Sequence, residues 1–209
     1  MTTASLRRYT DLAAALRMLR QKSITLLPPN TWDDKNDRHL MQAYQAAEGY
    51  KSVLALCFAQ AAETYHHWKV FSSGKDGICI VFDKQRLVSD ISQHEVRHAS
   101  VQYYTLKQLR ENRPNIERIP YSKRAAYVDE KEYRFVFCSK LEELASKDFA
   151  FSRASVDRIL INPWMPIPLV QTIKDIIHSL PEFDTVEILQ STVIDGPAWK
   201  ELAEQVRNG

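Results

Sequence analysis

The sequence predicts a single α+β domain, residues 1–209, with a mixed central β-sheet flanked by helices. The chain length is within the size that one hydrophobic core serves. Continuous apolar runs, such as residues 53–58 and 78–82, are typical of strands that are buried on both faces. Segments with helical apolar spacing lie between these runs without strict alternation, which favours a mixed sheet over a doubly wound one.

The elements follow from these patterns in chain order. Strands are expected at residues 6–9, 23–27, 53–58, 78–82, 95–104, 133–138, 156–161 and 185–189. Helices are expected at residues 12–19, 39–50, 63–72, 105–112, 167–180 and 197–206, with a short basic helix around Lys123-Arg124. Thr10 is expected to cap the first helix, and residues 28–38 and 113–120 are expected to be loops. Strands 6–9, 53–58, 78–82 and 133–138 are expected to be central in the sheet, and the last three of them are apolar runs that suit burial on both faces.

The charge, the cysteines and the N-terminal sequence bear on the possible partners and location of the protein. The net charge of +2 gives no general reason to expect nucleic acid or an anionic membrane as a partner. Three widely spaced cysteines in apolar surroundings favour reduced thiols in a core. The sequence shows neither an N-terminal signal peptide nor an apolar run of about 20 residues, so a cytoplasmic location is expected.

Common cofactor and metal motifs are also missing from the sequence. Five glycines occur, and none forms a G-x-G-x-x-G or P-loop pattern. There is no C-x-x-C or H-E-x-x-H motif, so we expect neither bound zinc nor a dependence on magnesium. Asp33, Asp34 and Asp37 present an alternative, because several convergent carboxylates can bind a divalent cation. The same residues are more typical of a loop in which Asp side chains cap and turn the backbone, and this interpretation is favoured.

Two further segments have both a structural and a functional interpretation. Tyr65, Trp68 and Phe71 recur at helical spacing, as in a core stripe or in an aromatic wall for a base or cofactor. Glu130 and Glu132 flank a lysine directly before an apolar strand and would share one face if extended. A carboxylate at such a strand end can orient a hydroxyl and stabilise a developing cation. The structural alternative is an ion pair between Glu132 and Arg134.

With these residues identified, the chain resembles a widespread bacterial family of uncharacterised domains. The first strand and helix match it at Arg7-Arg8-Tyr9-Thr10, and the acidic loop matches it at Pro29 to Asp37 without the second proline. His67-Trp68-Lys69-Val70-Phe71 and Val101-Gln102-Tyr103 follow in the same order. The most specific motif is Lys-x-x-x-Trp-x-x-Glu-x-Glu-(Tyr/Trp)-Arg, represented here by Lys123, Tyr127, Glu130, Glu132, Tyr133 and Arg134. Ala59 and Phe71 depart from the serine and tyrosine of the family pattern.

The layout of this family is similar to that of ADP-ribosyltransferases, and the resemblance implies a fold of that kind with NAD as substrate. On this analogy Arg8, Tyr9 and Thr10 would bind the nicotinamide ribose or the phosphates, and Trp68 or Phe71 would stack near the nicotinamide. Glu132 would hydrogen-bond the ribose and stabilise the oxocarbenium-like transition state. Glu130 would activate the acceptor.

Three functions therefore remain open at the level of sequence. The first is an NAD-dependent ADP-ribosyltransferase, such as a toxin or phage-defence effector, that acts on a protein or nucleic-acid acceptor. The second is a non-catalytic binding module of a bacterial defence or mobile-element system. The third is a metal-dependent nucleic-acid processing enzyme that uses Asp33, Asp34, Asp37 and Glu132. Convergence of Arg8, Trp68 and Glu132 on one pocket is the observation that bears most directly on the first.

Overall fold

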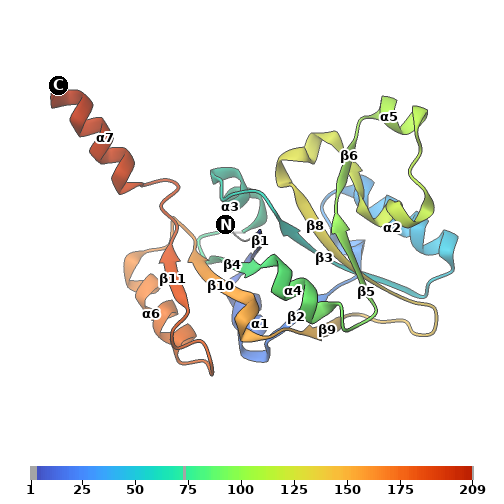
Figure 1. Cartoon of the computed structure of the whole chain (residues 1–209), viewed down its shortest axis with the longest axis horizontal. Coiled ribbons are helices and arrows are strands. Elements are labelled where there is room, and N and C mark those ends of the chain that lie inside the picture. The colour runs from blue at the N-terminus through green and yellow to red at the C-terminus, as the bar shows by residue number, and fades with distance from the viewer. Residues whose placement is uncertain (1–3, 73, 209) are drawn as a thin grey trace.

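A seven-stranded, mostly antiparallel sheet forms the centre of the molecule in a computed structural model that describes residues 4–72 and 74–208 (Figure 1). Its strand order is β11-β10-β4-β1-β3-β8-β5, and β10 with β11 is its parallel pair. The strands are β1 (Ser5–Asp11), β3 (Ser52–Ala59), β4 (Gly77–Asp83), β5 (Val96–Ser100), β8 (Glu132–Ser139), β10 (Val156–Ile161) and β11 (Glu187–Gln190). The four strands that were predicted to be central are β4, β1, β3 and β8, which are consecutive and internal in the sheet. That prediction is confirmed.

Helices and two small sheets complete the α+β architecture that the sequence predicts. The helices are α1 (Leu12–Gln21), α2 (Lys35–Glu48), α3 (Tyr65–Phe71), α4 (Lys84–Ile91), α5 (Leu106–Glu111), α6 (Ile167–His178) and α7 (Pro197–Asn208). The two-stranded sheets pair β2 (Ser23–Leu26) with β9 (Lys147–Ala150) and β6 (Gln102–Tyr104) with β7 (Ser122–Arg124). Short 3-10 helices are η1 (Pro29–Thr31), η2 (Ile116–Tyr121), η3 (Ala125–Glu130) and η4 (Arg153–Ser155).

The two faces of the sheet are covered differently. Alternate residues of a strand point to opposite faces, and Leu54, Leu56 and Phe58 belong to the large core beneath α1, α4 and α6. Val53 and Ala55 point the other way, toward a smaller core with α2 and η2. A third small cluster packs α3 against β1 and β4 on that second face. Because α2 and α3 cover separate parts of the second face, the surface between them is left open.

The sheet itself opens at the same place. Within the described residues β1 pairs with β4 at seven positions, and β3 pairs with β8 at eight. By contrast, one residue pair, Arg7 with Ala59, joins β1 to β3. Beyond that pair no further pairing joins the two strands within the described residues, so a gap separates them.

The structure corrects four details of the predicted elements. Asp11, not Thr10, caps α1, because its carboxylate accepts the backbone N–H of Ala14 at 2.8 Å while Thr10 remains paired in β1. Helix α2 begins at Lys35, so Asp37 belongs to a helix and not to a loop. The strand predicted at 95–104 is two strands in different sheets, β5 in the central sheet and β6 in the sheet with β7. The backbone N–H of Val101, which lies between them, donates to the carbonyl of Glu132.

The fourth correction concerns the segment around Lys123, which was expected to be a short basic helix. It is strand β7, paired in parallel with β6, and the helical turn η3 follows it. Strand β9 was not predicted, because the segment is short and its single buried residue, Phe149, gives no periodic pattern.

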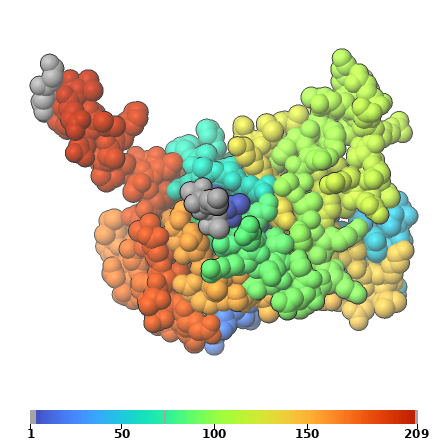
Figure 2. Space-filling view, in the orientation of Figure 1, coloured from blue at the N-terminus to red at the C-terminus, as the bar shows by residue number. Residues whose placement is uncertain are grey.

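Helix α7 projects away from the rest of the molecule (Figures 1 and 2). Each of its residues from Pro197 to Arg207 is exposed, including the large apolar side chains of Trp199, Leu202 and Val206. In the part of the chain that the structure describes, no helix has the length and apolar character needed to cross a membrane.

Candidate functional site

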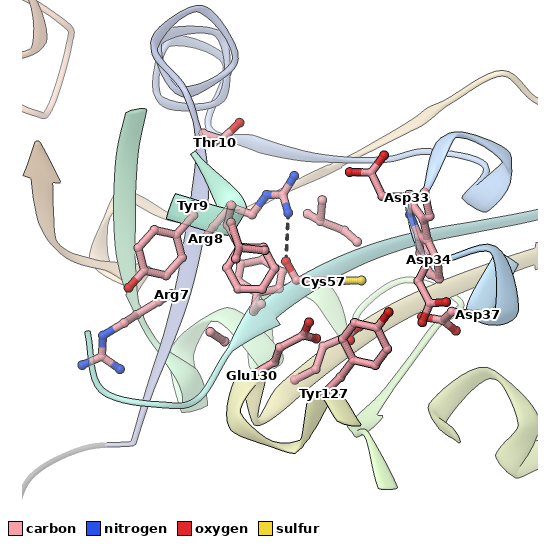
Figure 3. A pocket seen from close by; sticks show the side chains of 18 of the residues that line it. Arg7, Arg8, Tyr9, Thr10, Asp33, Asp34, Asp37, Cys57, Tyr127 and Glu130 are labelled. Carbon is pink, nitrogen blue, oxygen red and sulfur yellow. Dashed lines mark hydrogen bonds between the residues drawn. The ribbon is translucent and has the colours of Figure 1, made fainter. Parts of the chain in front are cut away.

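A cavity of about 580 Å³ occupies the gap between β1 and β3 (Figure 3). Residues of β1 and β3 form its floor, the end of α3 forms one wall, and η1 with the start of α2 forms the opposite wall. The turn η3 and the first residue of β8 close the remaining side. The cavity therefore exists because β1 and β3 separate and because no helix of the described chain lies over their junction.

Arg8 supplies a cation to this cavity. One guanidinium nitrogen donates to the backbone carbonyl of Cys57 at 3.0 Å across the gap between the strands (Figure 3). Its Nε has no hydrogen-bond partner within residues 4–72 and 74–208. Burial lowers the pKa of Arg8, although the nearby Cys57, Asp11 and Glu132 oppose this shift. A half-buried arginine whose hydrogen-bonding partner is a neutral carbonyl is well suited to bind an anionic group of a ligand.

Glu130 and Glu132 lie on another side of the cavity and are bridged by Lys123. The ammonium of Lys123 donates to Glu130 Oε2 at 2.6 Å and to Glu132 Oε2 at 3.1 Å. Lys131 between the two glutamates has a left-handed conformation, with a φ of 43°. Glu130 therefore ends η3 and does not lie on the same extended strand as Glu132. The lysine, not a shared strand face, brings the two carboxylates together.

Glu132 is also the partner of a buried arginine. Arg134 donates through Nε to Glu132 Oε1 at 2.7 Å, and its two terminal nitrogens donate to the two oxygens of Asp37 at 3.2 and 2.8 Å. It also donates to the carbonyl of Pro120 at 2.8 Å, and the ring of Trp32 lies 4.7 Å from its guanidinium. The ion pair with Arg134 that the sequence offered as the structural role of Glu132 is therefore present, and both of its side chains are buried.

The two glutamates have opposite pKa shifts. Burial alone would raise the pKa of Glu132, but Arg134 and Lys123 outweigh it and lower the pKa to about 2. Burial raises the pKa of Glu130, and Lys123 opposes that rise without cancelling it. Glu132 is thus a permanent anion, whereas Glu130 is the better proton acceptor. Neighbouring carboxyl groups that differ in this way are typical of sites that divide electrostatic and acid–base roles.

Six of the seven side chains predicted for the site line this cavity, namely Arg8, Tyr9, Thr10, Phe71, Glu130 and Glu132. Trp68 does not line it. Its side chain is fully buried, its ring packs edge-on against Tyr9 with centroids 5.1 Å apart, and its indole N–H donates to Glu63 at 2.5 Å. Phe71, one turn further along, is the aromatic residue of α3 that lines the cavity.

The structure adds several residues to those that the sequence selected. Lys123 and Tyr127 line the cavity, and Asp37 and Arg134 hold Glu132 from behind. Lys123 and Tyr127 already belong to the motif that contains Glu130 and Glu132, so their spacing was the signal that could have identified them. The partner of Arg134 in α2 had no such signal, because Asp37 lies 97 residues earlier in the chain.

The acidic segment is largely engaged in structural contacts. Asp34 caps α2 by accepting the N–H of Asn36 at 2.9 Å, as one of the two interpretations of this segment proposes. Asp37 is occupied by Arg134. Among the described residues, no group of three or more His, Cys, Asp or Glu side chains is close enough to hold a metal ion.

Comparisons with solved structures find three complexes of DarT from Thermus sp. 2.9. The complex with NAD+ is 11% identical, covers 91% of this chain and 96% of that chain, and has a TM-score of 0.45. The complex with ADP-ribosylated ssDNA is 9% identical, with coverages of 90% and 94% and a TM-score of 0.45. The complex with carba-NAD+ is 12% identical, with coverages of 91% and 97% and a TM-score of 0.44. No curated protein matches the chain.

A family model, described as "Protein of unknown function (DUF2971)", matches residues 67–135. The resemblance to an uncharacterised domain family is thereby confirmed. The matched segment runs from α3 into β8, and it includes Phe71, Lys123, Tyr127 and both glutamates of the cavity.

Proposed function

We propose that the cavity binds NAD and that the protein transfers ADP-ribose from NAD to an acceptor. One observation carries the proposal: Arg8, which no carboxylate of the described residues binds, lines the same cavity as the Lys123-bridged pair Glu130 and Glu132. NAD has a matching distribution of charge, since its pyrophosphate is anionic and its nicotinamide–ribose linkage is cationic.

The cationic side of the cavity would bind the pyrophosphate. Arg8 offers guanidinium N–H groups to phosphate oxygens, and charged hydrogen bonds of this kind are stronger than neutral ones. Tyr9 and Thr10 line the cavity beside Arg8. Phe71 offers an aromatic surface to the nicotinamide. From the sequence, either Phe71 or Trp68 was expected in this role.

The carboxylates would act on the ribose. When the bond between C1′ and nicotinamide breaks, its electron pair leaves with nicotinamide and positive charge develops on the ribose. Glu132 is ionised at neutral pH and stabilises that charge. Two of its lone pairs are used by Arg134 and Lys123, and a carboxylate has about four acceptor sites, so it can also accept a ribose hydroxyl. An acceptor nucleophile then bonds to C1′ and gives its proton to Glu130.

The test combines binding and turnover. NAD should raise the melting temperature of the wild-type protein, and a bacterial extract that supplies acceptors should cause release of nicotinamide. Glu130→Gln should reduce release by about a hundredfold, which is a typical contribution of general-base catalysis, while it preserves the NAD-dependent thermal shift. Glu187→Gln, an exposed glutamate on the edge strand β11, is the matched control and should leave both readouts unchanged. A wild-type protein whose melting temperature does not respond to NAD would refute the proposal.

A specific observation also favours a second function, a non-catalytic binding module. Both oxygens of Glu132 are engaged by cations of the protein itself, as in a structural carboxylate. A thermal shift with NAD but no nicotinamide release with any extract would select this function. The metal-dependent nucleic-acid processing enzyme is not proposed, because Asp37 is occupied by Arg134 and Asp34 caps a helix. A role as a toxin or phage-defence effector, and the identity of the acceptor, stay predictions.

A further inference from the structure

Lys123 is held at the cavity by a small sheet of its own. It lies in β7 opposite Tyr103 of β6, and the Tyr103 hydroxyl accepts the backbone N–H of Glu132 at 2.8 Å. The β6–β7 sheet is therefore attached to the first residue of β8 through a side chain of each strand. This attachment places the lysine ammonium over both glutamates.

The surroundings of the ammonium leave it little freedom. Its side chain is 10% exposed, and its nitrogen contacts Glu130 at 2.6 Å, Glu132 at 3.1 Å and the ring of Tyr127 at 4.7 Å. Glu132 has a second cation in Arg134, whereas among the described residues Lys123 is the one cation that forms an ion pair with Glu130. The two carboxylates thus depend on Lys123 to different degrees.

We propose that Lys123 is a positioning residue that keeps Glu130 beside Glu132 and leaves the second oxygen of Glu130 available to the acceptor. This inference rests on the proposed function. Within residues 4–72 and 74–208, the Lys123 ammonium bonds Oε2 of Glu130, and Oε1 receives no hydrogen bond. An acceptor hydroxyl or amine can therefore approach Oε1 while Lys123 fixes the carboxylate by its other oxygen.

The charge of Lys123 is as important as its position. Burial favours the neutral form of Glu130, and the negative charge of Glu132 favours it further. Lys123 opposes both effects, so that without it Glu130 would bind a proton at a higher pH and cease to act as a base. Other charged and titratable groups surround Glu130 and Glu132. They are Lys123 of β7, Arg134 of β8, Tyr103 of β6, Asp37 of α2, Arg8 of β1 and Cys57 of β3.

The experiment measures nicotinamide release against pH for wild type, Lys123→Met and Lys123→Arg. In Lys123→Met the acid limb of kcat/KM should move upward by about one pH unit, which is roughly a tenfold loss on that limb and little loss above it. Lys123→Arg keeps the charge and should restore the wild-type limb. An acid limb that stays in place in Lys123→Met would overturn the inference, because a merely structural lysine would reduce activity equally at all pH values.

A second measurement does not require activity. The apparent pKa of the Glu130 carboxyl can be followed by carbon NMR in protein labelled at glutamate, and it should rise in Lys123→Met. Adding Lys123→Met to Glu130→Gln should cost less activity than Lys123→Met costs in the wild type, because Lys123 acts mainly through Glu130 and Glu132 keeps Arg134 as its second cation. If wild type releases no nicotinamide, the proposed function fails, and the NMR titration still decides the role of Lys123. An unchanged Glu130 titration in Lys123→Met would refute that role.

Discussion

Glu132 combines the two roles between which the sequence left a choice. It forms a buried ion pair with Arg134, and the same carboxylate lines the cavity. Arg134 also binds Asp37 of α2, so this arginine connects the strand that bears the glutamate to the helix that forms a cavity wall. A substitution at Glu132 will therefore affect folding as well as chemistry, and Glu130 is the better position at which to test catalysis alone.

Glu132→Gln should lower the free energy of unfolding near neutral pH. The folded-state pKa of Glu132 is about 2 against an ordinary value of 4.5, so its ionised form stabilises the folded protein by about 3 kcal/mol. Because the pKa is depressed on folding, this contribution is complete above about pH 4.5 and is lost as the pH falls toward 2. Urea unfolding of both proteins across this range should show the difference between them shrinking with falling pH. A difference that is independent of pH would contradict this origin.

Arg8→Ala should weaken NAD binding more than it affects stability. A hydrogen bond to a charged group contributes about 1.5–3 kcal/mol, so the NAD dissociation constant should rise roughly tenfold to a hundredfold. Titration calorimetry measures this change directly. Arg20→Ala, an exposed arginine in the last turn of α1, is the matched control and should bind NAD like wild type. Equal affinities for all three proteins would remove Arg8 from the binding site.

At the scale of elements, the position of α3 determines which aromatic side chain reaches the cavity. The helix is followed by Ser72, whose hydroxyl donates to the Trp68 carbonyl at 2.7 Å and accepts from Asn162 at 3.2 Å. Gly77, the first residue of β4, lies directly against Ser72, and a Cβ at position 77 would be 2.3 Å from the Ser72 Cβ. The close approach of α3 to β4, and with it the placement of Phe71, therefore requires a glycine.

Gly77→Ala should destabilise the protein and disturb the α3 wall of the cavity. Overpacking of this kind typically costs about 1–3 kcal/mol, and a melting scan would record the loss. NAD affinity should fall as well, because Phe71 precedes Ser72 directly. Gly196→Ala is the matched control, since its Cβ would make ordinary contacts at 3.6 and 3.7 Å. If Gly77→Ala melts at the wild-type temperature, α3 can shift without cost and this account of its position is wrong.

At the scale of the whole molecule, the two faces of the sheet have separate tasks. The large core beneath α1, α4 and α6 includes residues from all seven strands of the central sheet, whereas the opposite face has two smaller clusters with the cavity between them. Helix α7 belongs to neither face. It is exposed along its described length, and a helix of this size gains most of its stability from packing.

Ending the chain after Gly196 should therefore leave the core unchanged. The loss in unfolding free energy should be within the roughly 0.5 kcal/mol that is typical of changes at exposed sites. Melting temperature and NAD response of the shortened protein test this expectation together. A substantial fall in melting temperature would show that α7 packs against the protein in solution.

Local pattern was sufficient for the elements and for part of the site. The apolar runs of β3, β4 and β8 require burial on both faces, and this requirement identified three of the four inner strands. Strand β1 contains Arg7 and Arg8 and has no such run. The charged motif around Glu130 and Glu132 likewise indicated the carboxylates, because its residues are neighbours in the sequence. The helical predictions failed where a contact distant in the chain controls the backbone, as at Lys123, which pairs with Tyr103 in a sheet.

The cavity itself was decided by tertiary structure. Its existence depends on the separation of β1 from β3, which are paired at Arg7 and Ala59, and strand pairing over such distances leaves no local signal. Tertiary packing also determines that Phe71, and not Trp68, lines the cavity, because the Trp68 indole is buried and donates to Glu63. It joined Asp37 to Arg134 across 97 residues as well. The periodicity of a sequence predicts which side chains are buried. A buried charge needs a partner, but which residue supplies that partner depends on the tertiary fold.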